Sequence, residues 1–135
     1  MKISTNWLAK FVNISETPSE LAEMLTMLGF EAEVGVDFST MKNIVSAIVI
    51  STKKHPNADK LKLCQVFDGK DELQIVCGAP NVQTGQSIIL AKIGSILPGD
   101  FKIKKAKIRG EESYGMICSE RDLGLSDEHK GIMTL

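Results

Sequence analysis

The sequence predicts a mainly β protein in which a small two-helix piece precedes five short strands. Apolar residues recur at helical spacing only in the first part of the chain, up to Gly29. From residue 42 onward they alternate or form short runs, and turn-forming residues separate these runs. The composition, 43% hydrophobic and 24% charged, is typical of a globular protein. No apolar run approaches the roughly 18 residues of a membrane span.

The first forty residues predict two short helices. Ser4 or Thr5 can cap the first, in which Trp7 and Phe11 recur at helical spacing. The second begins with a capping box at 17–20 that has proline at the first helical position, and Gly29 ends it. A strand is expected at 31–36 and a linker at 37–40. Helices this short cannot bury a core alone, so residues 1–40 are expected to be an incomplete module that packs on other chain.

Five strands are expected in the remaining chain, at 43–51, 61–67, 73–77, 87–93 and 113–119. Pro56 breaks the first strand at a polar bend, Gly69 suits a hairpin turn, and Pro98 followed by Gly99 suits a type II turn. With a break after the third strand, this pattern predicts a five-stranded Greek-key barrel of the oligonucleotide/oligosaccharide-binding (OB) type, although a small open sheet would also fit. The tail from residue 120 is expected to be a loop with one helical turn at 123–125. Residues 41–135 would form this domain, truncated at its C-terminal edge.

Basic residues gather in two places, which we call the corner (residues 53–62) and the ribbon (residues 101–109). In the ribbon, Phe101 and Ile103 alternate in one phase and Ala106 and Ile108 in the other, so a bend near 104–105 must shift the register. Residues 1–41, 42–109 and 110–135 carry net charges of −4, +7 and −4. A basic middle segment suits a phosphate backbone, but a solvated lysine face without a partner explains the same pattern.

The sequence offers little for catalysis. His55 and His129 are the only histidines, and neither accompanies a nucleophile motif, a metal-ligand spacing or a phosphate-binding loop. Three separated cysteines without a C-x-x-C pair are expected to be buried, in a reducing, cytoplasmic setting. Phe67 and Phe101 are expected in the core, so recognition of RNA shape or backbone is favoured over base stacking.

Several motifs resemble the tRNA-binding domain that several synthetases share with free-standing tRNA-binding proteins. They are His-Pro-Asn-Ala-Asp-Lys-Leu at 55–61, Gly-Ala-Pro-Asn-Val at 78–82, Lys-Ile-Arg-Gly at 107–110 and Ser-Tyr-Gly-Met-Ile-Cys-Ser at 113–119. Residues 1–8 and 21–33 resemble the N-terminus of the β subunit of bacterial phenylalanyl-tRNA synthetase. The resemblance implies an OB barrel and an accessory, non-catalytic tRNA contact. With the two basic segments, the candidate RNA-binding residues are Lys53, Lys54, His55, Asn57, Lys60, Lys62, Asn81, Lys102, Lys104, Lys105, Lys107, Arg109, Ser113, Met116 and Ser119.

What the resemblance implies for the parent protein reaches beyond these residues. That enzyme attaches phenylalanine to its tRNA with ATP and magnesium, as an α2β2 heterotetramer whose aminoacylation and editing sites lie elsewhere. This chain, a fragment of the longer β subunit, is therefore expected to hold no cofactor or metal. Two alternatives stay open: a structural or docking module with little affinity for tRNA, and a dimeric tRNA chaperone, which the synthetase-like helices disfavour.

Overall fold

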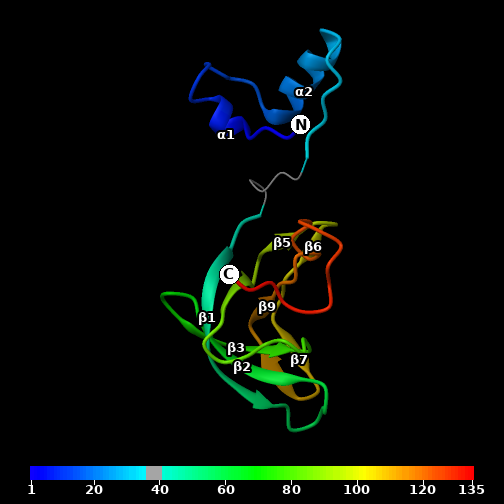
Figure 1. The fold of residues 1–135 in the computed structure, drawn as a ribbon. Coiled ribbons are helices and arrows are strands. Elements are labelled where there is room, and N and C mark those ends of the chain that lie inside the picture. The colour runs from blue at the N-terminus through cyan, green and yellow to red at the C-terminus, as the bar shows by residue number, and fades with distance from the viewer. Residues whose placement is uncertain (36–40) are drawn as a thin grey trace. The chain divides into compact units, whose positions relative to one another are not determined.

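The computed structural model describes residues 1–35 and 41–135, so the predicted linker at 37–40 lies outside the described residues. The chain divides into two compact units, Met1–Asp37 and Phe38–Leu135, and each is described here by itself (Figure 1).

The N-terminal unit contains the two predicted helices. Helix α1 spans Thr5–Leu8 after an N-cap at Ser4, and α2 spans Pro18–Met27. The capping box is present: Glu20 N–H donates to the Thr17 hydroxyl, and the Glu20 carboxylate accepts from Thr17 N–H at 2.8 Å. Gly29 follows α2 with φ +91°, a conformation that glycine adopts without strain.

The expected strand at 31–36 was wrong over its described part, because residues 31–35 form no strand. Instead, a hydrogen bond ties this segment to α2: the Thr26 hydroxyl accepts from Ala32 N–H at 3.4 Å. Neither helix has a buried residue, and Trp7 and Phe11 remain 55% and 68% exposed although their rings meet edge to face.

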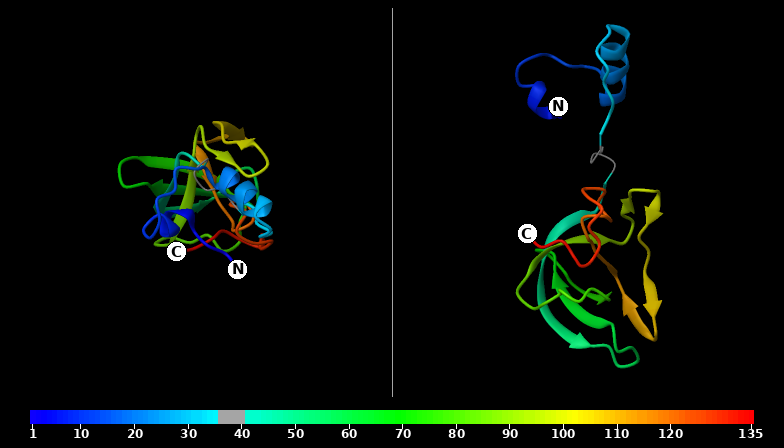
Figure 2. Two further views of the ribbon diagram at one scale, coloured as in Figure 1. Left: turned by 90° about the horizontal axis from the view of Figure 1, so that it is seen from above. Right: turned by 45° about the vertical axis from the view of Figure 1, so that its right-hand side comes forward.

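The second unit is a five-stranded antiparallel sheet in the order β3-β2-β1-β4-β9 (Figures 1 and 2). The strands are β1 (Ile44–Lys54), β2 (Lys62–Phe67), β3 (Glu72–Cys77), β4 (Ser87–Lys92) and β9 (Gly115–Ile117). Two small hairpins project from it: β5 (Ile96–Leu97) with β6 (Phe101–Lys102), and β7 (Ala106–Ile108) with β8 (Glu111–Ser113). The predicted fold class, mainly β with an OB-type barrel after two helices, is confirmed.

The sheet nearly closes into a barrel because β3 bonds to the last residue of β8 and to Tyr114, which lies between β8 and β9. Tyr114 N–H donates to Gln74 O at 2.9 Å, and Val76 N–H donates to the Ser113 hydroxyl at 3.0 Å. Gly115 permits the tight packing that follows, since a Cβ there would lie 2.7 Å from Ala91 O. The predicted single strand at 113–119 was therefore wrong: Tyr114 leaves the ladder to bond β3, which divides the segment into β8 and β9.

Two apolar clusters fill the unit. The first lies inside the barrel and includes Val49, Val66 and Leu90; the second packs Ala91, Leu97, Ile103, Cys118 and Leu123 beneath the C-terminal segment. All three cysteines are buried, and burial raises the pKa of Cys64 to about 11 and of Cys118 to about 12. The tail forms hydrogen-bonded turns rather than the expected helical turn at 123–125, and Thr134 bridges to Ile88.

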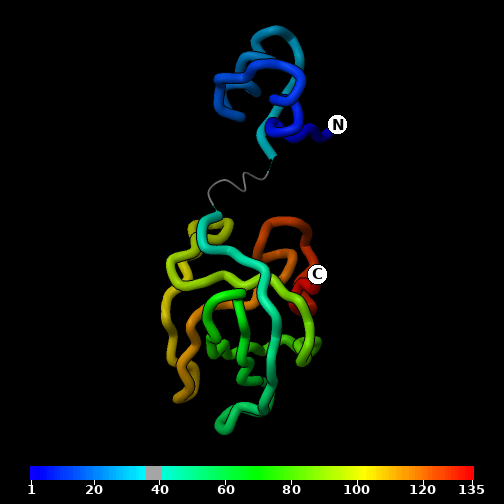
Figure 3. Tube along the Cα trace, turned by 90° about the vertical axis from the view of Figure 1, so that its left-hand side faces the viewer, coloured from blue at the N-terminus to red at the C-terminus, as the bar shows by residue number. Residues whose placement is uncertain are grey.

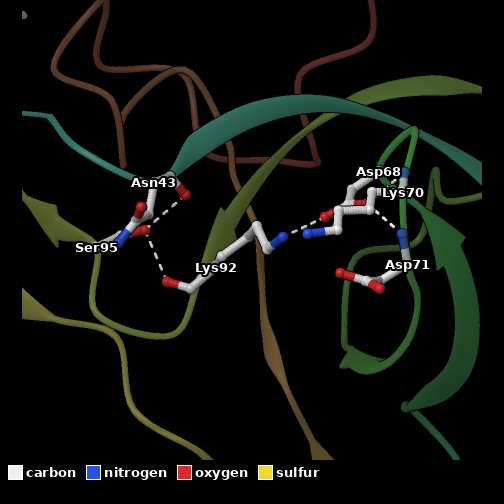
Figure 4. A network of polar contacts seen from close by, with 6 residues as sticks. All are labelled: Asn43, Asp68, Lys70, Asp71, Lys92 and Ser95. Carbon is white, nitrogen blue, oxygen red and sulfur yellow. Dashed lines mark hydrogen bonds and ion pairs between the residues drawn. The ribbon is translucent and has the colours of Figure 1, made fainter.

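A polar network joins the β2–β3 turn to the end of β4 (Figure 4). The Asp68 carboxylate accepts from the N–H groups of Asp71 and Lys70 and pairs with the Lys92 ammonium. The Asp71 N–H, then Lys92 and the Lys70 N–H, hold the pKa of Asp68 well below its usual value. Beside it, the Ser95 hydroxyl donates to main-chain oxygens of Asn43 and Lys92.

The predicted change of register in the ribbon is confirmed. Strand β6 ends at Lys102 and β7 begins at Ala106, and between them Ile103 turns into the second apolar cluster. The main chain of Ile103 continues the β5–β6 pairing, because its N–H donates to Ser95 O at 2.8 Å and its C=O accepts from Gly94 N–H at 2.9 Å. The ribbon runs along one side of the barrel, yellow to orange in Figure 2.

Candidate nucleic-acid interface

The corner is fastened to the ribbon through His55, which is only 2% exposed. Its Nε2 lies 3.0 Å from Ile108 O, and its Nδ1 lies 3.0 Å from Asn57 N. A carbonyl can only accept and a main-chain N–H can only donate, so the ring is the neutral tautomer with its proton on Nε2. Asn57 adds a second link, since its Nδ2 donates to Arg109 O at 3.2 Å. Figure 3 accordingly shows the corner and the β7–β8 turn at the same end of the barrel.

The lysines of the corner differ in how freely they face solvent. Lys53, Lys54 and Lys60 are exposed, and Lys54 pairs with Asp59 at 3.0 Å in an exposed contact that contributes little to stability. Lys62 is half-buried instead. Its ammonium donates to Val82 O at 2.9 Å and to Pro80 O at 3.4 Å, so it holds the loop that follows β3.

All five basic side chains of the ribbon are exposed: Lys102, Lys104, Lys105, Lys107 and Arg109. Lys105 pairs with Glu112 at 2.8 Å and lies 4.8 Å from the centroid of the Tyr114 ring. The Glu112 carboxylate, followed by Tyr114, raises the pKa of Lys105. Arg109 has φ +48°, and with Gly110 it makes the turn into β8 that the corner contacts.

Four other candidates from the sequence hold neighbouring segments in place through their side chains. Asn81 exchanges two hydrogen bonds with the main chain of Ile132, at 2.8 and 3.0 Å. Ser113 and Ser119 are buried, the first bonded to Val76 N–H and the second to Asp122. Met116 is half-buried against the second apolar cluster. Ser113, Ser119 and Met116 therefore shape the surface from beneath, as His55 does, whereas Asn81 is exposed but has its amide engaged by the C-terminal segment.

A cleft of about 830 Å³ opens between the ribbon, the end of β3 and the C-terminal segment. It collects Lys102 and Lys104 from the ribbon, and from the tail it collects three residues that the sequence reasoning missed: Arg121, His129 and Lys130. No local signal could have found them, because they stand in a segment of net charge −4 and only the fold brings them to the ribbon.

Phe101 also lines the cleft and is 57% exposed, so its expected place in the core was wrong. Phe67, 37% exposed, is also not a core residue.

Within residues 1–35 and 41–135, no group of three or more His, Cys, Asp or Glu side chains is arranged to hold a metal ion. Over the same described residues, no helix is both long and apolar enough to cross a bilayer.

The chain is similar to known proteins over its whole length. The family described as "Putative tRNA binding domain" matches residues 44–135, the whole of the barrel. Over its full length the chain is 53% identical to the phenylalanine–tRNA ligase β subunit of Geobacter metallireducens and 54% identical to that of Geobacter sulfurreducens. It is 51% identical to the β subunit of Staphylococcus aureus over 96% of the chain.

The chain spans only 17% of the length of the two Geobacter subunits and 16% of the Staphylococcus subunit. The predicted resemblance to the β subunit of bacterial phenylalanyl-tRNA synthetase is confirmed at the level of sequence. The chain belongs to the tRNA-binding domain family.

Proposed function

We propose that the chain is a non-catalytic tRNA-binding module of a phenylalanine–tRNA ligase β subunit. It contributes an accessory basic surface while the rest of the enzyme attaches phenylalanine to its tRNA in the cytoplasm. The ligase would use ATP and magnesium at a site outside these residues, and the full-length β subunit would assemble with an α subunit as α2β2.

One observation carries the proposal: His55 and Asn57 bond to the main chain of Ile108 and Arg109. These bonds attach the corner, in which Lys53 and Lys60 are exposed, to the β7 end of the ribbon. Cations from two distant parts of the chain then face solvent on adjoining segments. Such a surface suits the regularly spaced phosphates of a folded RNA, which position a protein without reading sequence.

The test is a titration of tRNA with the chain at low salt, followed by fluorescence anisotropy. The proposal predicts binding that weakens steeply as salt is added, because each phosphate contact releases counterions. No binding at tens of micromolar chain would contradict it.

A second function, a docking module with little affinity for tRNA, is favoured by an apolar patch on the outer face of the barrel. Ile48 and Phe67 are cross-strand partners on β1 and β2, and both are exposed, as is nearby Ile50. If docking were the main role, replacing Ile48 and Phe67 by threonine would weaken association with other parts of the synthetase, and tRNA affinity would be low from the outset.

We also propose that residues 1–40 belong to a module completed by other chain. The exposed aromatic pair Trp7–Phe11 supports this, because a unit of two short helices buries too little apolar surface to be stable alone. Amide hydrogen exchange is the test: α2 should exchange far faster than β1 in this chain, and equal protection of the two would contradict the proposal.

A further inference from the structure

The cleft beside the ribbon has features that contacts to an RNA backbone do not require. Its volume of about 830 Å³ lies in the range of about 300–1,000 Å³ that is usual for organic ligands. Its lining includes apolar residues from two segments: Val76 of β3 and Pro80 after it, and Ala106 and Ile108 of the ribbon. A surface that only attracted phosphate would not need an apolar interior.

An exposed aromatic ring lies among the lining residues. The chain around Phe101 directs its neighbours Leu97 and Ile103 into the second apolar cluster, and the Phe101 ring itself is left 57% exposed. His129 supplies a second planar ring from the tail. Exposed aromatic rings next to cations are the platforms on which proteins stack unpaired bases, because every base has a flat face.

Cations from both walls surround this interior. Lys102 and Lys104 come from the ribbon, and Arg121 and Lys130 come from the tail. Asp122 is the one acidic residue of the lining, and its carboxylate already accepts from the Ser119 N–H and hydroxyl at 2.8 and 2.7 Å. The balance of charge thus favours an anionic occupant.

A polar main-chain group is also available. Lys104 stands between β6 and β7, and none of the described residues forms a hydrogen bond with its N–H or C=O. The edge of a base carries both donors and acceptors, so it can bond to such a group where an aliphatic ligand cannot.

We propose that this cleft takes an unpaired nucleotide of an RNA, with its base stacked on Phe101 and the adjoining phosphates held by Lys102, Lys104, Arg121 and Lys130. The proposal rests on the proposed tRNA-binding function and deepens it. The corner and the ribbon bind the backbone, while the cleft selects RNA that has a free base. A blunt duplex cannot fill the cleft, because its bases are already stacked and paired. An acidic peptide would engage the cations without using the ring.

The experiment measures anisotropy of labelled tRNA, a single-stranded RNA of about 12 nucleotides and a blunt duplex of equal length with the 135-residue chain. Phe101→Ala removes the ring, and Phe101→Leu keeps apolar bulk without a flat face, which separates stacking from any loss of folding. Phe67→Ala is the matched control, since Phe67 is also partly exposed but does not line the cleft.

Both Phe101 variants should weaken binding of the single strand about five- to 100-fold, the usual effect of removing a stacked ring. The salt dependence should stay unchanged because no cation is lost. Duplex binding should not change, and Phe67→Ala should bind every RNA like the wild type.

Unchanged affinity of Phe101→Ala and Phe101→Leu for the single strand, with normal salt-dependent binding of tRNA, would overturn the cleft assignment and leave the proposed function standing. Absence of binding to all three RNAs would overturn both. Displacement of the single strand by a poly-glutamate peptide at equal concentration, with Phe101→Ala displaced as readily, would assign the cleft to an acidic peptide instead.

Discussion

At the scale of single residues, Asn81 shows how one side chain can hold a whole segment. Its amide exchanges two hydrogen bonds with the main chain of Ile132, which attaches the C-terminal segment to the loop after β3. Gly131 fits beside it only because it lacks a Cβ, which would overlap the Asn81 amide.

We expect Asn81→Ala to lower the free energy of unfolding by about 1–3 kcal/mol, because the main chain of buried Ile132 loses both partners. Thr84→Ala, at an exposed position of the same loop, should change it by less than about 0.5 kcal/mol. Urea denaturation measures both. Equal effects of the two substitutions would show that Asn81 does not hold the segment.

Asp68 makes the stability of the folded chain depend on pH. The Asp71 N–H and the Lys92 ammonium lower the pKa of Asp68 in the folded chain, so the folded state favours the charged carboxylate. Its contribution is therefore complete above the unfolded pKa of about 4 and is lost as the pH falls from there toward the lower folded pKa.

The prediction is that wild type and Asp68→Asn differ in thermal stability at pH 7 and converge as the pH is lowered below about 4. Asp100→Asn is the control, since Asp100 is exposed and its φ of +56° suits asparagine equally well. Asp100→Asn should follow the wild type at every pH. A constant difference between wild type and Asp68→Asn down to pH 2 would refute this role of Asp68.

At the scale of elements, the corner and the ribbon are held together by a ring that does not face solvent. His55 satisfies one main-chain acceptor on β7 and one main-chain donor in its own turn. Removing the ring leaves both groups without their partner, so only the exposed Asn57–Arg109 hydrogen bond would still hold the corner to the ribbon.

His55→Ala should therefore lower the free energy of unfolding by about 1–3 kcal/mol. It should weaken tRNA binding without changing the slope of affinity against salt, because no cation is removed. His129→Ala serves as the stability control, since His129 is exposed. If His55→Ala reduced the salt slope as a lysine substitution does, His55 would be a direct phosphate contact and our positioning role for it would be wrong.

At the scale of the whole molecule, local signals predicted the main strands of the sheet, and the family resemblance favoured a barrel over an open sheet; the short hairpins β5–β6 and β7–β8 were not predicted. The Thr17 capping box, the Gly69 turn and the change of phase around Lys104 are all properties of a few adjacent residues. No local signal in the sequence could show that the strand predicted at 31–36, after α2, would not form. A strand exists only through a partner, and the sequence does not show whether one is nearby.

The candidate site was harder to predict for the same reason. Charge and exposure of the ribbon lysines could be read locally, whereas Arg121 and Lys130 join them only through the path of the tail. His55 and Ser113 belong to the motifs that resemble the tRNA-binding domain, at 55–61 and 113–119. The fold nevertheless buries both side chains, because each bonds to a strand far away in sequence. Phe101 was wrongly expected in the core because it shares its phase with Ile103. Ile103 packs in the second apolar cluster, whereas Phe101 is 57% exposed, so the shared phase did not predict equal burial.

The central claim, that the corner and the ribbon form one surface for RNA phosphates, is tested most directly by the salt dependence of tRNA affinity. Lys104→Glu/Lys107→Glu is compared with Lys42→Glu/Lys70→Glu, a pair that changes the net charge equally but lies outside both basic segments. We predict that the first pair weakens binding strongly and reduces the slope of log affinity against log salt by about one for each lysine, while the second pair keeps the wild-type slope. Equal losses of affinity and slope in the two pairs would mean that tRNA responds only to overall charge, and would contradict the claim.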